Sequence, residues 1–353
     1  MVMRMPTRRL ATTACLAFLL ALTGLAGPAF GALLPAPKGK VYTGVSDNGT
    51  LKGFENFTDR TGKHPAILQT FHPWGNGLEL AYQRWQNAQV RPMLHISTAD
   101  DETRAELITP KDIARGKGDD YLIEINRFFA EKKLRAYIRP LAEPNRCLNP
   151  YSAVTCSGRL KGGEHSTAWY RKAFQRISLI VRGGSTTNRL DSKLRKLGMP
   201  AVNFGFSPRR SALPTPPVSI VWSPLPAGSP KVKGNFPIDY WPGASYVDWA
   251  GTDFYSNYPS WKDLDKFYKG KPWRKKPVSM TEWGVVHKDD AKFAKKMFKW
   301  VKQRSRVGML VYYRGFGDSD PYNDINYPKT LNVIRQNLGS ARYLGWASGH
   351  AAG

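Results

Sequence analysis

The sequence predicts an α/β protein of one domain, a (β/α)8 TIM barrel with elaborated loops. β-prone runs alternate with amphipathic helical segments along the chain, which is the pattern of a parallel sheet covered by helices. The β-prone runs are eight in number, and eight parallel strands close into a barrel. About 320 residues remain after an N-terminal export signal, which is within the range of one such barrel with long loops.

The eight β-prone runs span residues 41–45, 66–71, 93–96, 136–141, 218–222, 246–254, 278–281 and 309–313. Between them apolar side chains recur at helical spacing. The helical sets are Leu78, Tyr82 and Trp85; Ile125, Phe128 and Phe129; Trp169, Ala173, Phe174 and Ile177; Phe293, Met297, Trp300 and Val301; and Leu331, Ile334 and Leu338. Their tryptophans are interpreted as packing residues.

Two segments disturb this regular alternation. Residues 183–217 are rich in Gly, Ser, Thr, Pro and Arg and contain a candidate extra strand at residues 201–206. We interpret this segment as an elaborated connection between the fourth helix and the fifth strand. Residues 225–242 form a Pro- and Gly-rich loop, which we expect on the face where the strands end.

The N-terminus is typical of a secretory signal peptide. Arg4, Arg8 and Arg9 precede an apolar run at residues 11–26, and small residues follow it. We expect a signal peptide at residues 1–32 and the barrel at residues 33–353. No second apolar run reaches a membrane-spanning length, so the sequence predicts a secreted, extracellular monomer.

Export makes the three cysteines interpretable. Cys15 leaves with the signal peptide, and the remaining pair, Cys147 and Cys156, is predicted to form a disulfide in an oxidising compartment. A metal site would need more Cys or His nearby, and a catalytic thiol would not come as a pair. We expect no metal and no cofactor. The bridge closes a small loop just after Glu143 and would brace that wall of a site.

The chain is strongly basic, with a formal net charge of +26 at pH 7. A charge of this size is compatible with nucleic-acid binding or with a surface adhesin that uses a basic face. The basic residues are spread along helical faces and loops without a nucleic-acid-binding motif, so no nucleic-acid partner is expected. A solvated basic surface that favours anionic cell walls or acidic glycans is the preferred interpretation.

The fourth and seventh β-prone runs each lead to one carboxylate, Glu143 and Glu282. A lone strand-end glutamate is by default satisfied by an arginine or by a helix N-terminus. Active sites of barrels gather at the carboxyl ends of the strands, however, and strands four and seven face each other across the mouth. Two carboxylates placed in this way indicate a catalytic pair.

Aromatic and polar residues at the other strand ends suit a sugar, whose C–H faces stack on rings while its hydroxyls bond polar tips. Trp74, Trp222 and Trp283 are open to two interpretations, substrate contact or core capping. Arg139 is expected to point into the barrel as a partner of a carboxylate. The candidate substrate-binding residues are His72, Trp74, Arg139, Asn145, Trp222, Tyr255, Trp283 and Tyr313. Of two histidines, His72 is favoured over His95.

Glycosidic cleavage needs one carboxylic acid to protonate the departing oxygen and one carboxylate to attack the anomeric carbon. A separation of about 5–5.5 Å between them gives retention of configuration. Glu143, in an irregular Ala-Glu-Pro-Asn turn, is the predicted proton donor. Glu282 is the predicted nucleophile, and the Tyr255 hydroxyl is expected to orient it.

The stretch Arg-Pro-Leu-Ala-Glu-Pro-Asn at residues 139–145 resembles the Arg-Pro-Leu-His-Glu-Met-Asn stretch of family 26 glycoside hydrolases, a group that includes secreted β-mannanases. The resemblance continues in the family's order through residues 221–224, 240–255 and 276–284, and it spans residues 41 to 338.

The resemblance implies a clan A retaining barrel with Glu143 as acid/base and Glu282 as nucleophile. Asn145, Trp222 and Tyr255 would contact the sugar or orient the nucleophile. The implied activity is that of a secreted retaining endo-β-glycosidase, similar to a mannan endo-1,4-β-mannosidase, acting on a β-mannan-type polysaccharide or a related β-glycan.

The sequence departs from the family at three positions near the acid/base. Ala142 stands where the family has His, Pro144 stands where it has Met, and Leu225 stands where Asn often follows Trp-Ser-Pro. These changes remove polar contacts that grip the sugar beside the bond that is cut. The alternative interpretation is a catalytically weakened barrel that binds glycans or cell wall without turnover.

Overall fold

The structure is a computed structural model that describes residues 33–205 and 209–348. The predicted signal peptide, and Phe206 of the candidate extra strand, lie outside the described residues. No helix among the described residues is long and apolar enough to cross a membrane.

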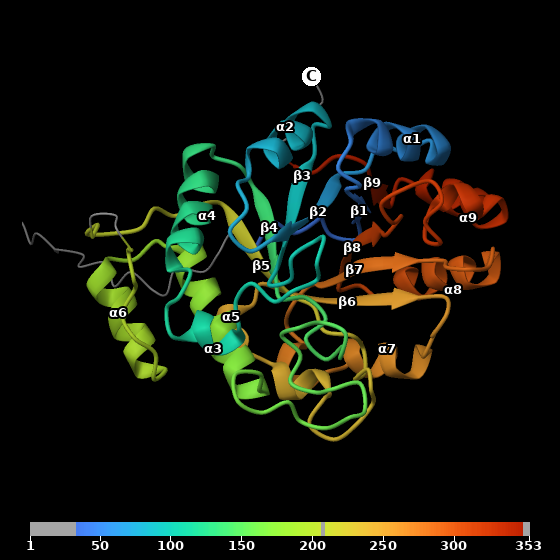
Figure 1. Ribbon diagram of the computed structural model, residues 1–353. Coiled ribbons are helices and arrows are strands. Elements are labelled where there is room, and N and C mark those ends of the chain that lie inside the picture. The colour runs from blue at the N-terminus through green and yellow to red at the C-terminus, as the bar shows by residue number, and fades with distance from the viewer. Residues whose placement is uncertain (1–32, 206–208, 349–353) are drawn as a thin grey trace, which may run out of the picture.

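Eight parallel strands close into a barrel, because β1 pairs with β2 on one side and with β8 on the other. The prediction of a (β/α)8 barrel is confirmed, and each predicted β-prone run overlaps one strand. Figure 1 shows the strands at the centre with helices around them. The strands are β1 (Val41–Ser46), β2 (Ile67–Pro73), β3 (Arg91–Ser97), β4 (Ala136–Pro140), β5 (Val218–Trp222), β6 (Trp249–Tyr255), β7 (Val278–Gly284) and β8 (Val307–Tyr312); a short β9 (Tyr343–Leu344) pairs with β1 outside the barrel.

The helices pack their apolar faces onto the barrel, and several begin at a residue whose side chain caps the first turn. Thr50, Ser166 and Asp290 accept hydrogen bonds from backbone N–H groups of their helices. The five predicted helical segments are confirmed as α2, α4, α5, α8 and α9. The helices are α1 (Leu51–Thr61), α2 (Glu79–Asn87), α3 (Pro110–Ala114), α4 (Asp119–Glu131), α5 (Thr167–Arg182), α6 (Thr187–Lys196), α7 (Trp261–Tyr268), α8 (Ala291–Lys302) and α9 (Pro328–Leu338), with 3₁₀ turns at η1 (Pro237–Tyr240), η2 (Ala244–Tyr246), η3 (Lys271–Trp273) and η4 (Asp324–Asn326).

The long connection at residues 183–217 contains α6, which stands apart from the barrel in Figure 1. The extra strand expected at residues 201–206 is wrong for its described part, residues 201–205. The backbone N–H of Val202 donates to Asp191 Oδ1 at 2.8 Å, and that of Asn203 donates to Asp119 Oδ2 at 2.8 Å. These donors therefore bond to helix side chains and not to a neighbouring strand.

Residues near both ends of the described chain cover the amino-terminal end of the barrel, opposite the carboxyl ends of the strands. Tyr137 donates to the carbonyl of Leu34 at 2.6 Å, and the indole of Trp249 donates to the carbonyl of Leu33 at 2.7 Å. Arg91 donates to the carbonyl of Ser348 at 2.6 Å. Because the amino-terminal end of the barrel is closed in this way, we expect a site at the carboxyl ends of the strands.

A register shift in β7 decides which way Glu282 faces. Thr252 of β6 pairs with Met280, but Asp253 pairs with Glu282, so β7 carries one extra residue, Thr281. Regular alternation from Ser279, whose register partner is Met309 of the barrel interior, would turn Glu282 outward. The bulge reverses the alternation and places Glu282 inside the mouth.

Candidate active site

Glu282 is held by donors on both of its oxygens. Arg139 Nη1 and Gln69 Nε2 donate to Oε1, the latter at 3.1 Å, while the Tyr255 hydroxyl donates to Oε2 at 2.5 Å. The glutamate is 8% exposed. Three donors from three different strands fix the orientation of a carboxylate that still reaches the mouth.

Arg139 is fully buried and links several inward-facing side chains. Besides Glu282 it donates to Asp253, to the Ser223 hydroxyl at 2.7 Å and to Gln69 Oε1 at 3.1 Å. Burial acts to lower the pKa of Arg139, but the charges of Asp253 and Glu282 outweigh it and raise that pKa well above the ordinary value. The guanidinium therefore stays charged beside Glu282 and Asp253.

Glu143 follows β4 and has a left-handed backbone conformation, with φ of 49°. For a residue with a β-carbon this conformation costs on the order of 1–3 kcal/mol and persists where the surroundings hold it. Its N–H donates to the carbonyl of Ser223 at 2.7 Å, and its carbonyl accepts from Asn149 at 2.9 Å. On the side chain, Oε2 accepts from Arg146 Nη1 at 2.8 Å.

The same residues connect the two carboxylates. Ser223 accepts the Glu143 N–H on its carbonyl and the Arg139 guanidinium on its hydroxyl, and Arg139 contacts Glu282 directly. The charges of Glu143 and of Glu282 both raise the pKa of Arg139 and of Arg146. The structure thus brings Glu143, Glu282, Arg139 and Tyr255 together at the carboxyl ends of the strands.

A group of aromatic side chains lies beside Glu282, and we call it the aromatic wall. Tyr322 lies with its ring centroid 5.2 Å from Tyr255 and 5.0 Å from Tyr313, and Phe71 lies 5.8 Å from Tyr313. Phe316, 59% exposed, extends the wall at 6.0 Å from Phe71. Burial and the charge of Glu282 raise the pKa of Tyr313, so its hydroxyl keeps its proton. These rings present apolar faces and O–H groups of the kind that bind sugars.

The three predicted tryptophans lie in the packing between the strands and helices. Trp222 is fully buried against Trp241 and Trp273, and Trp283 packs against Phe298. Trp74 packs on Tyr121 of α4. Side chains alternate along β5, and Ser223 faces the barrel interior, so alternation predicts that Trp222 faces the helices. We leave these three rings out of the proposed sugar surface.

The two histidines differ in their hydrogen bonding. His72 Nε2 is hydrogen-bonded to the carbonyl of Asn76 at 2.8 Å, and burial lowers its pKa. His95 faces Phe71 in an edge contact at 5.3 Å, and neither of its ring nitrogens has a hydrogen-bond partner within the described residues. Burial, followed by Arg139, lowers the pKa of His95 well below its ordinary value. His95 is therefore a neutral group with two free nitrogens.

Asn145 anchors a loop. Its amide accepts from the N–H of Leu225 at 2.8 Å and donates to the carbonyls of Leu225 and Ala227, each at 3.1 Å. All these contacts are within the Pro- and Gly-rich loop predicted at the mouth. The amide oxygen and nitrogen both hold this loop, and a sugar contact by Asn145 stays a prediction.

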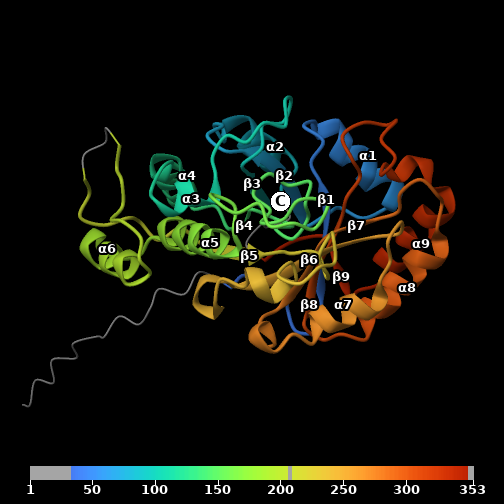
Figure 2. The same ribbon diagram turned by 60° about the horizontal axis from the view of Figure 1, so that its bottom comes forward.

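Cys147 and Cys156 form a disulfide with a Cα–Cα distance of 5.0 Å. The N–H of Cys147 donates to the carbonyl of Ser229 at 2.8 Å, so the bridged loop is joined to the loop after β5. Figure 2 shows these two loops, green and yellow, near each other beside the strands. The bridge thus supports the wall that carries Glu143.

Four mouth residues were missed by the sequence analysis: Gln69, Phe71, Arg146 and Tyr322. Alternation along β2 places Gln69 and Phe71 on the inner face with Ile67, which is a usable signal. Nothing in the sequence distinguishes Arg146 or Tyr322 from other loop residues.

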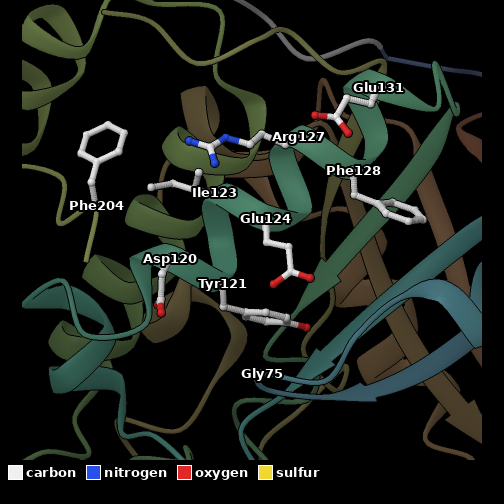
Figure 3. A pocket seen from close by; sticks show the side chains of 9 residues that line it. All are labelled: Gly75, Asp120, Tyr121, Ile123, Glu124, Arg127, Phe128, Glu131 and Phe204. Atoms are coloured by element: carbon white, nitrogen blue, oxygen red, sulfur yellow. The ribbon is translucent and has the colours of Figure 1, made fainter. Parts of the chain in front are cut away.

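A separate hollow of about 520 Å³ lies beside α4 and contains neither glutamate of the mouth. In Figure 3 the side chains of Tyr121 and Glu124 point to one side of α4, with Arg127 further along the helix and Phe204 apart from it. We assign it no ligand. Among residues 33–205 and 209–348, no group of three or more His, Cys, Asp or Glu side chains is arranged to hold a metal ion.

No protein-family model matches the sequence, and no curated protein matches it. Solved structures do match over most of the chain. GH26A from Muricauda sp. MAR_2010_75 is 15% identical, with 87% of this chain and 92% of that chain covered and a TM-score of 0.55. A GH26 β-mannanase from Bacteroides ovatus is 15% identical, with 89% and 92% covered and a TM-score of 0.58. The catalytic domain of a GH26 endo-β-1,4-mannanase from Bacillus sp. JAMB-750 is 14% identical, with 92% of each covered and a TM-score of 0.57. These likenesses show that the chain has the same fold.

Proposed function

We propose that this chain is a divergent family 26 glycoside hydrolase, a secreted retaining endo-β-glycosidase with Glu143 as acid/base and Glu282 as nucleophile. The observation that carries the proposal is the setting of Glu282, whose two oxygens are oriented by Arg139, Gln69 and Tyr255 inside a barrel mouth shared with Glu143. The fold shared with family 26 mannanases supports it.

The reaction has two displacement steps. In the first, Glu282 attacks the anomeric carbon, the bond from that carbon to the glycosidic oxygen breaks, and Glu143 gives its proton to the departing oxygen. A covalent glycosyl-enzyme ester on Glu282 results. In the second, water attacks the same carbon and gives a proton to Glu143, and the ester bond to Glu282 breaks. Two inversions give net retention.

The surroundings of Glu282 fit this cycle. Attack turns a carboxylate into a neutral ester and its release restores the charge, so donors on both oxygens stabilise the leaving carboxylate of the second step. Arg139 remains balanced by Asp253, itself held by the Thr281 hydroxyl at 2.7 Å. The positive charge beside the ester is therefore never unpaired.

The substrate class follows from the wall beside the carboxylates. The rings of Phe71, Tyr313 and Tyr322 and the exposed Phe316 offer a surface for successive sugar units of a β-mannan or related β-glycan. The disulfide agrees with an oxidising, extracellular location.

One set of observations favours the second candidate function, a glycan-binding barrel with weakened catalysis. Ala142 and Pro144 flank Glu143, the Asn145 amide is bonded to the neighbouring loop, and Arg146 occupies one oxygen of Glu143. Such a barrel would bind a glycan without cutting it.

The test is release of reducing ends from soluble β-mannan, glucomannan, mixed-linkage β-glucan, xylan and an anionic glycan. Wild type is compared with Glu143→Gln, Glu282→Gln and, as a matched control, Glu164→Gln, an exposed glutamate of the same loop. We expect one glycan to be cut by wild type and by the control at ordinary rates of about 1–1000 per second, and to be spared by the other two variants. Full activity of either would refute the proposal, and binding without turnover would favour the second function.

A further inference from the structure

Arg146 lies over the carboxylates at the mouth and is open to solvent. Its side chain is 42% exposed, against 11% for the Glu143 side chain with which it pairs. The charge of Glu143 raises the pKa of Arg146, and Tyr255 and Glu282 contribute in the same direction. One end of the guanidinium is thus used by Glu143, while its other N–H groups remain available to a ligand.

This ion pair conflicts with the role proposed for Glu143. A general acid has to face the departing oxygen, whereas Arg146 Nη1 donates to Glu143 Oε2 at 2.8 Å and so occupies one of the two carboxyl oxygens. Arg146 has no second carboxylate partner among the described residues, so no described carboxylate competes with Glu143 for it. A substrate group that binds the guanidinium would remove the conflict.

We propose that the substrate is a 1,4-linked glycan that carries a carboxylate on the sugar unit whose O4 is the departing oxygen, and that Arg146 binds this carboxylate. The inference deepens the proposed glycosidase function and rests on it. Its ligand class is a uronan, a polymer of uronic acid units.

The chemistry of a uronan places its charge where Arg146 lies. The departing oxygen is bound to C4, and the neighbouring C5 carries the carboxylate. A group that protonates this oxygen therefore stands next to the carboxylate and would face a like charge. Arg146 pairs with it through two parallel N–H groups, the geometry in which arginine binds carboxylates best. The Glu143 oxygen that Arg146 occupies is then free to face O4.

The charges around Arg146 agree with this placement. In the loop after β5, Lys233 is exposed, Lys231 pairs with Asp263 of α7 at 2.8 Å, and residues 223–236 include no acid. That loop is joined to Arg146 by a bridge to Ser229. On the β8 side of the mouth the loop carries Asp318 and Asp320. The mouth is therefore basic on the side of the acid/base, where the departing unit lies.

The test uses matched oligosaccharides that differ only at C6. β-1,4-Mannuronan is compared with β-1,4-mannan, and β-1,4-glucuronan with cello-oligosaccharides, at low salt. We expect wild type to prefer the uronan of one pair by at least tenfold in kcat/KM. Arg146→Gln should lose that preference, with a fall of at least tenfold in kcat/KM on the uronan. Arg159→Gln, an exposed arginine of the same loop, removes an equal charge and should keep the preference.

The outcomes separate the inference from the function on which it rests. A wild type that cuts a neutral glycan with no gain from the carboxylate overturns the inference and leaves the glycosidase function intact. If no oligosaccharide is cut, calorimetric binding of mannuronan and glucuronan to wild type and to Arg146→Gln decides: a loss of at least tenfold in affinity supports the role of Arg146, and equal or absent binding overturns it. Circular dichroism checks that each variant is folded.

Discussion

Arg139 of β4 and Glu282 of β7 meet inside the barrel, where a guanidinium N–H of Arg139 donates to Oε1 of Glu282. A second nitrogen of the same guanidinium donates to Asp253 of β6. One buried arginine thus balances two carboxylates and positions the candidate nucleophile. This relationship ties the stability of the upper barrel to the proposed chemistry.

Replacing Arg139 by Gln should therefore affect both properties. Removing one partner of a buried pair leaves Asp253 and Glu282 unbalanced, at an expected cost of about 3–5 kcal/mol in the free energy of unfolding. Urea unfolding measures this cost, with Arg159→Gln as the surface control. A loss below about 1 kcal/mol, the range of an exposed pair, would contradict the buried pairing.

Tyr255→Phe removes the hydroxyl that donates to Glu282 Oε2 and leaves the ring in place. A hydrogen bond to a charged group contributes about 1.5–3 kcal/mol, so we expect kcat to fall by about 10–100-fold. KM should change little, because the ring contacts persist. Steady-state kinetics on the glycan that wild type cuts are the measurement, and an unchanged kcat would refute the orienting role.

Asn145→Ala should act through stability. The variant removes three hydrogen bonds that hold the loop after β5, which predicts a loss of about 1–3 kcal/mol. The midpoint of thermal unfolding should fall, and KM should stay unchanged, because a loss of folded protein lowers the apparent kcat and not KM. A normal midpoint with a raised KM would instead indicate that Asn145 contacts the sugar, as the family resemblance implies.

His95 predicts a pH dependence of folding. Burial and the charges of Arg139 and Arg104 lower its pKa in the folded state, while the unfolded chain has a pKa of about 6.5. Below about pH 6.5 the unfolded state binds more protons, so the free energy of unfolding falls as the pH drops, by up to about 1.4 kcal/mol per pH unit. His95→Gln should flatten this slope between about pH 5 and 6.5 in urea titrations. His72, whose pKa burial also lowers, contributes in the same direction. An unchanged slope in the variant would contradict the assignment.

Most of the fold could be predicted from local sequence patterns. Each strand was readable from its β-prone run, because neighbours in a closed parallel barrel bury both faces of a strand. Residues of the site could be predicted from the sequence only where side chains alternate regularly along a strand. Trp222 faces the helices while Ser223 faces the mouth, as the two-residue period requires. Glu282 breaks that period at Thr281, and a bulge depends on the pairing of neighbouring strands, which the run itself does not encode.

The parts of the site that the sequence could not predict lie in loops. Asn145 belongs to the motif that resembles family 26, yet its amide bonds to a loop 80 residues away in sequence. The role of Arg146 follows from a backbone turn that returns its side chain to Glu143. The contacts of Asn145 depend on how two loops pack, and the contact of Arg146 depends on an irregular turn, so no regular pattern of residue types reveals either of them.

The central claim, that Glu143 and Glu282 are acid/base and nucleophile of one retaining site, is tested most directly by rescue with azide. Glu143→Ala and Glu282→Ala are incubated with azide and 2,4-dinitrophenyl β-glycosides of mannobiose and cellobiose, and NMR assigns the anomeric configuration of the glycosyl azide. Glu143→Ala should yield the β-azide, because azide attacks the intermediate on Glu282. Glu282→Ala should yield the α-azide, because azide replaces the missing nucleophile. Products of the same configuration from both variants, or the reverse assignment, would contradict the account.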